Sequence, residues 1–262
     1  MVLAACGAPR AVVRPAPVRP IEAAFLVVSN QSTGPVAIGS PRGLWVTLSG
    51  GRRWTLQHPD SGPVRAIGFV GDTAWVSRGS SYTIYDRALQ HVLVPTQPWP
   101  FPGDVGAMAY ELGNGRMWAF ADDQLWYNPI EGRPWRRRTA IGLCPKPVAF
   151  AATRAMGGGD GVVRLLAACG DAGLYASDDL GQSFFRLPAP TTAIAVATTS
   201  ADAGLVLVAS PEVLISHDRG ASFSKAPLSA SLVALDTRNT RVMYALAVDG
   251  FLHISIDGGH TF

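Results

Sequence analysis

Short apolar runs alternate with turn-forming clusters along most of this chain, and the pattern is clearest toward the C-terminal end. One unit contains three such runs, at residues 192–198, 205–209 and 212–216. Each run is only a few residues long and rich in alternating or β-branched residues, and a cluster of glycine, proline, serine or aspartate follows it. The pattern predicts a unit of three short strands followed by a turn and a short fourth strand.

The same division applies to other parts of the chain. Apolar runs that predict strands lie at residues 21–29, 35–39 and 44–48; at 64–70, 73–77 and 82–86; at 147–153, 162–169 and 173–177; and at 232–236, 243–248 and 251–255. Such even spacing of short strands is typical of an all-β fold built from one repeated unit.

An eight-residue phrase that fits S-x-D-x-G-x-(S/T)-F occurs three times after the third strand of a unit. The copies begin at Ser177, Ser216 and Ser255, so successive copies are 39 residues apart. A fixed period of this length indicates a propeller or a solenoid made of one supersecondary unit.

The phrase resembles the Asp-box, or BNR, repeat of sialidase-like, sortilin-like and photosystem-assembly-factor-like propellers, which forms the turn between the third and fourth strands of a blade. An aspartate in a tight turn can accept backbone N–H groups, glycine can adopt a positive φ, and the phenylalanine begins the next strand. Because a catalytic group repeated in every blade has no chemical use, we interpret these residues as structural rather than as calcium ligands or acids. The set is Asp179, Gly181, Phe184, Asp218, Gly220, Phe223, Asp257, Gly259 and Phe262.

Two diverged copies of the phrase extend the frame toward the N-terminus. Residues 47–54 keep the glycine and the final aromatic with serine in place of aspartate, and residues 128–135 do the same with Ile130 at that position. The unit between them has lost the phrase. We therefore expect a β-propeller of about six four-stranded blades, whose last blade is incomplete because Phe262 ends the third phrase. On this basis we expect a fragment, cut at both ends.

The N-terminal residues predict an export signal followed by a tether. Residues 3–6 match the lipobox of bacterial lipoproteins, in which Cys6 would be lipidated, although only five residues precede it and the match can also be coincidence. Residues 7–20 carry four prolines with arginines between them, which favours an extended linker of about 40 Å. The expected domains are 1–6 (signal remnant), 7–20 (tether) and 21–262 (propeller), with an exported, envelope-bound location and no membrane contact other than a lipid at Cys6.

Composition excludes some partners. The formal net charge of +3 is too small to favour nucleic acid or an anionic membrane surface, so we expect neither. The densest basic cluster, Arg136–Arg138, falls where an outermost strand is expected, and charge on an edge strand discourages edge-to-edge pairing. No run of about 18 apolar residues, the length of a spanning helix, occurs.

Cys144 and Cys169 flank a predicted hairpin around the glycine-rich residues 157–161. A disulfide between them suits an oxidising compartment, and two free thiols are the alternative. Their spacing does not resemble a zinc site, and the five histidines are scattered, so we expect no metal and no cofactor.

The resemblance raises the question of sialidase activity, which uses a tyrosine nucleophile beside a glutamate and three arginines. Tyr110 and Glu111 are adjacent, so on a strand they point to opposite faces. Arg65 is the one arginine near a predicted inner-strand start, and the Arg-Ile-Pro-like motif of the family is reduced to residues 18–20. Signatures of other enzyme classes are absent from the sequence.

We therefore expect a non-catalytic exported binding or assembly module that grips a protein or a glycan through loops on one face. The alternatives are a divergent exo-sialidase-like glycoside hydrolase and a truncated gene product without a fixed role. A central pocket with two arginines and a Tyr–Glu contact would favour the hydrolase.

Overall fold

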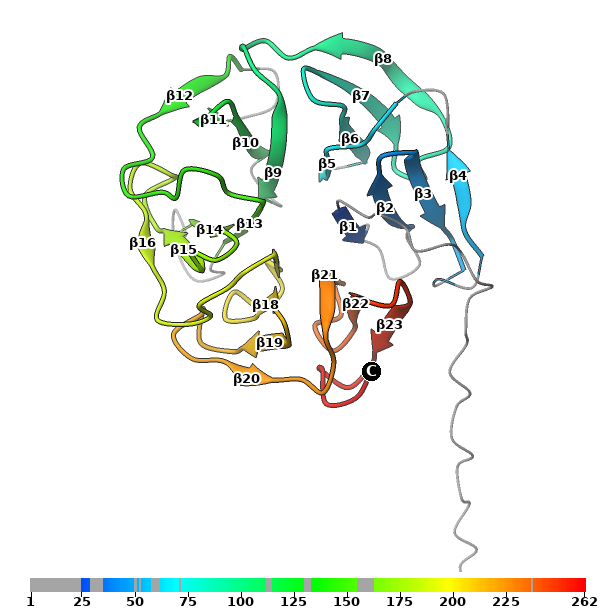
Figure 1. Cartoon of the computed structure of the whole chain (residues 1–262). Coiled ribbons are helices and arrows are strands. Elements are labelled where there is room, and N and C mark those ends of the chain that lie inside the picture. Colours follow the sequence, from blue (N-terminus) through cyan, green and yellow to red (C-terminus); the bar gives the residue numbers. More distant parts are fainter. Residues whose placement is uncertain are drawn as a thin grey trace, which may run out of the picture.

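The computed structural model describes residues 25–28, 35–49, 51, 53–57, 62–70, 72–111, 115–129, 133–154, 163–236 and 238–262. Within these ranges the chain forms 23 strands and no helix. The strands form six small antiparallel sheets arranged as blades around an axis (Figure 1). The predicted all-β propeller is confirmed, and so is the number of blades.

The strands occur in the order of the chain, with the first strand of each blade innermost. Blade 1 contains β1 (Phe25–Val28), β2 (Val36–Ser40), β3 (Gly43–Thr47) and β4 (Thr55–Gln57); blade 2 contains β5 (Ala66–Val70), β6 (Thr73–Ser77), β7 (Ser81–Asp86) and β8 (Val92–Pro98); blade 3 contains β9 (Val105–Glu111), β10 (Arg116–Ala121), β11 (Gln124–Asn128) and β12 (Arg136–Arg138).

The second half of the ring repeats this plan. Blade 4 contains β13 (Ala149–Arg154), β14 (Val163–Ala168), β15 (Leu174–Ser177) and β16 (Phe185–Arg186); blade 5 contains β17 (Ala195–Thr198), β18 (Val206–Ala209), β19 (Val213–Ser216) and β20 (Ser224–Lys225); blade 6 contains β21 (Ala230–Leu235), β22 (Met243–Ala247) and β23 (Leu252–Ser255). Blade 6 has three strands among the described residues, so the expected incomplete last blade is confirmed.

The strand directions divide the propeller into two faces. Inner strands end on one face, where the connections between the first and second strands and between the third and fourth strands also lie; we call this the turn face. The opposite face carries the connections between the second and third strands and those that lead to the next blade. In blade 3, Glu111 and Arg116 therefore lie at the turn face, and the β10–β11 turn lies at the opposite face.

Apolar side chains from neighbouring blades fill the space between them. Small residues are frequent on the inner strands, as in Ala107 and Ala109 of β9, because side chains are crowded near the axis. Blades 1 and 6 close the ring through one shared cluster, in which Ile38 packs with Leu232 and the partly buried Trp45. The described strands of blades 1 and 6 stay in separate sheets, so this closure depends on side-chain packing.

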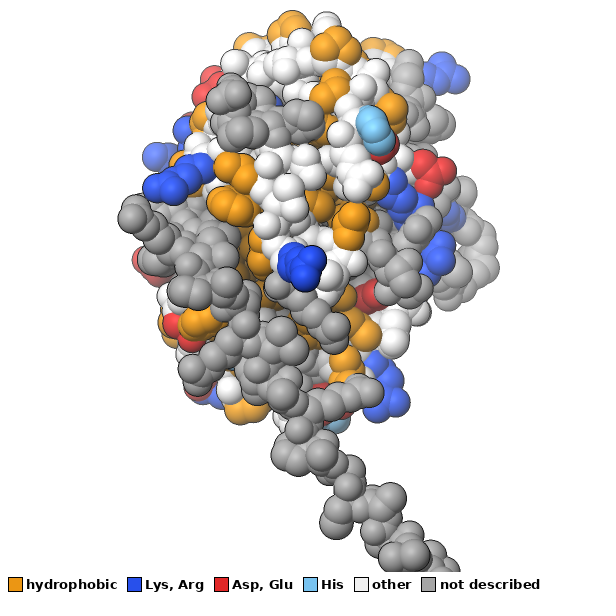
Figure 2. Space-filling view, turned by 90° about the vertical axis from the view of Figure 1, so that its right-hand side faces the viewer, with side chains coloured by type: hydrophobic (Ala, Val, Ile, Leu, Met, Phe, Trp, Pro, Cys, Tyr) orange, Lys and Arg blue, Asp and Glu red, His pale blue; other side chains and the backbone are white. Residues whose placement is uncertain are grey.

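The outermost strands differ in their chemistry. As expected, the three arginines form β12, on the outer edge of blade 3. Strand β8 has no charged residue and exposes Val92 and Leu93. On the side of the ring that carries β4 and β8, hydrophobic side chains are interspersed with polar and charged ones (Figure 2).

Strand limits differ from the predicted ones mainly at inner strands. The predicted strand at 192–198 begins at Ala195, because Ala193 instead exchanges two backbone hydrogen bonds with Gly170 of blade 4. Residues 1–20 with Cys6, and the glycine-rich residues 157–161, lie outside the described residues.

Candidate functional site

The three repeated phrases form turns with the same hydrogen bonds. In blade 4, Ser177 Oγ donates to Asp179 Oδ1 at 2.8 Å and accepts the N–H of Gly181 at 2.9 Å. Asp179 Oδ1 also accepts the N–H groups of Gln182 and Ser183, both at 2.9 Å. The aspartate therefore gathers the backbone donors of its own turn, and the corresponding residues of blades 5 and 6 do the same.

These contacts hold the carboxylates in their charged form. Hydrogen bonds from the Ser222 hydroxyl and N–H, and from Ser216, lower the pKa of Asp218 to about 2. Those from Thr261 and Ser255 lower the pKa of Asp257 as well. Because these acceptors already serve the turn, they are not arranged to receive a proton from a substrate.

Each turn also rests on the preceding blade. Gly181 has φ +81°, and a Cβ there would come within 2.8 Å of Leu125 in blade 3. In blade 1, Gly51 has φ +85° and faces Leu252 of blade 6 in the same manner. The glycine is therefore needed both for its positive φ and for close packing. The rings of Phe184, Phe223 and Phe262 pack between blades beside these turns.

The diverged turns keep part of this chemistry. In blade 1, Thr47 Oγ1 accepts the N–H of Gly51 at 3.1 Å and Ser49 Oγ accepts that of Arg53 at 2.9 Å, so Ser49 takes the role of the aspartate. In blade 2, Asp86 ends the third strand and accepts the N–H of Gln90 at 2.7 Å. Residue 86 lies 39 positions after residue 47, a spacing that the sequence analysis overlooked because no letters of the phrase remain.

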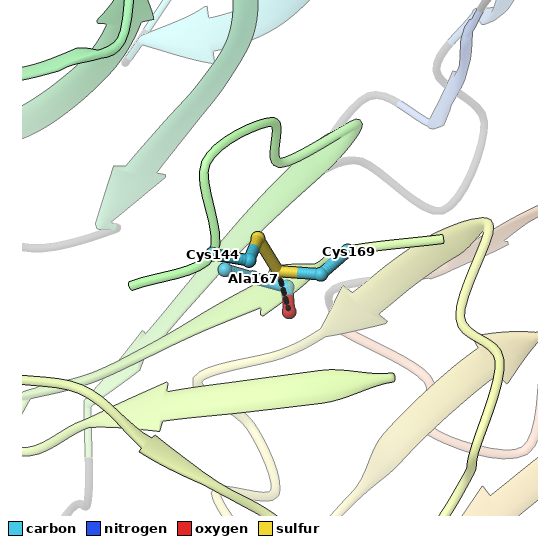
Figure 3. The surroundings of a disulfide bond; sticks show 3 residues. All are labelled: Cys144, Ala167 and Cys169. Atoms are coloured by element: carbon cyan, nitrogen blue, oxygen red, sulfur yellow. Dashed lines mark hydrogen bonds between the residues drawn. A yellow bond between two sulfur atoms is a disulfide. The ribbon is translucent and has the colours of Figure 1, made fainter. Parts of the chain in front are cut away.

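Cys144 and Cys169 form a disulfide, with a Cα–Cα distance of 6.2 Å (Figure 3). Cys144 lies in the segment that leads into β13, and Cys169 directly follows β14. Both cysteines are buried against the cluster between blades 3 and 4. The bond therefore fastens the entry of blade 4 to its second strand, at the opposite face.

A buried carboxylate lies at the turn face between blades 3 and 4. The side chain of Glu111 is 0% exposed, and its Oε2 lies 3.5 Å from Nη1 of Arg116, while its Oε1 lies 4.0 Å from Nε of Arg154. Neither carboxylate oxygen has a hydrogen-bond partner within the described part of the chain. Burial raises the pKa of Glu111, and the two arginines only partly offset this effect. The sequence signal for this group is an ionisable residue that ends an otherwise apolar inner strand.

The tyrosine next to this glutamate points to the other side of the blade. Tyr110 packs with the cluster between blades 2 and 3, whereas Ala107 and Ala109, which share the face of Glu111, pack between blades 3 and 4. The expectation that neighbours on a strand diverge is confirmed. Arg65 lies just before β5, on the opposite face, so it is distant in the fold from the Glu111 group.

Aromatic side chains form a continuous stack between blades 2 and 3. Trp75 stacks on Tyr82 with ring centroids 4.9 Å apart, Tyr82 contacts Trp99 at 4.6 Å, and Trp99 contacts Phe101 at 5.4 Å. Phe101 in turn stacks on Trp126 at 4.8 Å, with the rings 10° from parallel. The indole N–H groups of Trp75, Trp99 and Trp126 are buried without a hydrogen-bond partner among the described residues.

An open hollow of about 400 Å³ lies at the end of this stack, near the β10–β11 turn. Three separate segments of blade 3 and of the connection before it form the hollow. Its lining combines one indole with a carboxylate, an amide and a guanidinium: Pro102, Ala121, Asp122, Gln124, Trp126 and Arg137. Sequence reasoning missed this site because no contiguous motif encodes it. A second hollow, of about 250 Å³ between blades 1 and 2, has no aromatic lining.

Metal sites and membrane-spanning helices are both absent from the described ranges. No group of three or more histidine, cysteine, aspartate or glutamate side chains could hold a metal ion. None of the described segments is a helix long and apolar enough to cross a membrane.

Comparison with known proteins gives the fold. No protein-family model and no curated protein matches the sequence. Among solved structures, the WD40 domain of Neurospora crassa Pan2 matches with a TM-score of 0.58 and 13% identity over 91% of this chain and 78% of that one. A GH74 enzyme of Niastella koreensis matches with a TM-score of 0.54 and 16% identity over 89% of this chain.

The extracellular domain of a one-component system of B. thetaiotaomicron matches with a TM-score of 0.57 and 12% identity over 93% of this chain. This chain spans 36% of the GH74 enzyme and 39% of the B. thetaiotaomicron protein. At such identities the likeness concerns architecture alone. The chain is a β-propeller of six blades, and its architecture is similar to that of this WD40 domain and this GH74 enzyme.

Proposed function

We propose that this protein is an exported, non-catalytic module of the Asp-box type that binds a protein or a glycan of the cell envelope. The observation that carries the proposal is the aromatic-lined hollow at the opposite face, where three exposed polar side chains converge and make only long hydrogen bonds with the rest of the protein. Binding through one face of a rigid ring suits a propeller, because the blades hold surface residues in fixed positions.

Export has separate support. The lipobox-like residues 3–6 and the proline-rich residues 7–20 fit a lipid anchor at Cys6 followed by a tether. The disulfide between Cys144 and Cys169 fits an oxidising compartment.

A glycoside hydrolase is the second candidate, and the Glu111 group favours it. A buried carboxyl with a raised pKa next to two arginines is a feature of active sites as well as of structural ion pairs. The architecture, which is similar to that of a GH74 enzyme, is also compatible with a glycoside hydrolase. The position of Tyr110 on the other side of the blade does not fit the Tyr–Glu arrangement of a sialidase.

The two functions can be separated with one preparation of the full chain. We would immobilise the protein, incubate it with solubilised cell-envelope material, and analyse what is retained with and without prior protease or periodate treatment. The same protein would be assayed for release of reducing sugar from envelope polysaccharides and for cleavage of chromogenic glycosides. Saturable retention without turnover supports the binding module. Turnover that Glu111→Gln abolishes would replace it with the hydrolase.

A further inference from the structure

The hollow beside Trp126 is built by strand pairing, which fixes how its groups face one another. Gln124 and Trp126 are two residues apart on β11, so their side chains project from the same side of the sheet. Arg137 of β12 is paired directly with Trp126 and therefore projects beside it. Asp122 comes from the β10–β11 turn. Three polar side chains thus converge around one indole.

The indole is held in place from behind. Phe101 covers one face of the Trp126 ring in a nearly parallel stack, and the same indole lines the hollow. The Nε1 atom of Trp126 is buried. A ligand in the hollow therefore meets the aromatic ring rather than its N–H group, and stacking against a ring favours flat, C–H-bearing surfaces.

The polar groups of the hollow include both hydrogen-bond donors and hydrogen-bond acceptors. An ionised carboxylate only accepts, a guanidinium only donates, and an amide does both. Asp122, Gln124 and Arg137 are all exposed. Arg137 Nη1 donates to Gln124 Oε1 at 3.4 Å, longer than a typical hydrogen bond, so both groups are available to a ligand.

The carboxylate has a fixed position. Asp122 and Asp123 form the two-residue turn with φ of 45° and 60°, a geometry that suits the twist of a hairpin. The Asp122 carboxyl group packs against Gly103, where an added Cβ would come within 2.7 Å of it. The side chain that a ligand would meet is therefore braced by the segment between β8 and β9.

The charges within the hollow balance. Asp122 contributes one negative charge and Arg137 one positive charge. The lining therefore carries no net charge that would favour a cation or an anion, and an uncharged ligand with several donors and acceptors fits this mixture of groups. The hollow lies near the lower end of the size range of ligand sites, which is about 300–1,000 Å³.

We propose that this hollow binds a neutral carbohydrate, with one or two sugar rings stacked on Trp126 and their hydroxyl groups shared among Asp122, Gln124 and Arg137. The proposal rests on the binding function above and names its ligand class. Sugar hydroxyls both donate and accept, which matches this mixture of groups. Sugar rings also present flat C–H faces to aromatic side chains.

The test uses the full chain and defined probes. Neutral oligosaccharides of the glucan, xylan and mannan types, with sialyllactose and heparin oligosaccharides as charged probes, would be screened by ligand-detected NMR. The strongest neutral probe would then be titrated by calorimetry. We expect Trp126→Ala to weaken its binding by about tenfold or more, because stacking and apolar burial are lost together. Gln124→Ala and Arg137→Ala, on exposed side chains, should each weaken it by several-fold.

Controls separate folding from binding. Leu48→Ala lies in the second hollow and should leave the affinity unchanged. Trp126→Phe keeps an aromatic ring and should retain more affinity than Trp126→Ala. If Trp126→Ala fails to fold, the two exposed variants still decide the question.

The proposal is overturned if no neutral probe binds, if charged probes bind more tightly, or if the exposed variants bind like wild type. The protein could instead retain an envelope component that survives periodate and is lost after protease treatment, while binding no sugar. This result would support the binding module and overturn the carbohydrate proposal. If the protein binds no sugar and retains no envelope protein, the carbohydrate proposal and the proposed binding function are both overturned.

Discussion

In blades 4, 5 and 6, each turn after the third strand carries the same serine, aspartate and glycine, and their hydrogen bonds are spent within the turn. In blades 2 and 3 the corresponding turns have diverged, while the aromatic stack, the open hollow and the buried Glu111 all belong to these blades or to their borders. In blades 4 to 6, which we call the regular half, the serine and aspartate of each repeated turn accept backbone N–H groups of that turn. Blades 2 and 3, which we call the irregular half, leave polar and aromatic groups available for binding. A binding site is therefore expected there.

The largest effect should come from emptying the core of the regular half. Leu207 on β18 is fully buried in the cluster shared by blades 1, 5 and 6. Leu207→Ala should lower the free energy of unfolding by about 2–5 kcal/mol, because it removes apolar contacts and leaves a cavity. Denaturant titration measures this change. The exposed Leu48→Ala is the matched control, and an equal loss there would show that the two positions do not differ as described.

The disulfide at the border of the two halves should come next. Replacing Cys144 and Cys169 together by serine should cost about 2–4 kcal/mol of stability, because the unfolded chain loses its cross-link. Thermal unfolding with and without a reductant measures the effect. Reductant should lower the midpoint of the wild type and leave the double variant unchanged; a wild type that is insensitive to reductant would count against the bond.

A single repeated turn should matter less. Ser216 is buried and accepts the N–H of Gly220 at 2.8 Å. Ser216→Ala should cost about 1–3 kcal/mol, because this buried donor loses its acceptor. Asp86→Ala, in the diverged turn of blade 2, should cost less, since its partners, the N–H groups of Gln90 and His91 and the His91 ring, are exposed and can bind water instead. Ser229→Ala, on the surface, is the control. If the blade 2 variant is the more damaging one, the comparison of the halves is wrong.

The smallest expected effect concerns pH. Since the pKa of Glu111 is raised in the folded protein, its contribution to stability is fully present below its ordinary pKa and is lost as pH rises through the folded value. Glu111→Gln should therefore gain stability relative to wild type as pH rises above the ordinary pKa of glutamate. Midpoints of thermal unfolding measured across this range test the sign. A difference that moves the other way would mean that the arginines dominate over burial.

The aspartates of the regular half should change the stability with pH in the opposite direction to Glu111. The lowered pKa values of Asp218 and Asp257 give stability that is present above their ordinary pKa and is lost as pH falls toward the folded values. Acid should therefore weaken these turns below the ordinary pKa of aspartate, a range in which Glu111 is already protonated.

The sequence was sufficient for the fold because the same four letters return every 39 residues, which indicates a propeller or a solenoid, and because the phrase resembles a repeat of propellers. It also placed Arg136–Arg138 on an outer edge, since strand order follows the chain in each blade. The hollow could not be predicted, because Pro102, Trp126 and Arg137 meet only after β11 has paired with β12 and the segment after β8 has packed on them. The Glu111 group was missed for a similar reason, as Arg154 reaches it from the next blade.

Hydrogen–deuterium exchange of the full chain, with and without a saturating neutral oligosaccharide, tests most directly whether binding belongs to the irregular half. Protection should appear in peptides that cover residues 100–104, 121–128 and 135–138, with exchange in blades 5 and 6 unchanged. Protection confined to the repeated turns of blades 4 to 6, or no protection at all, would contradict the account.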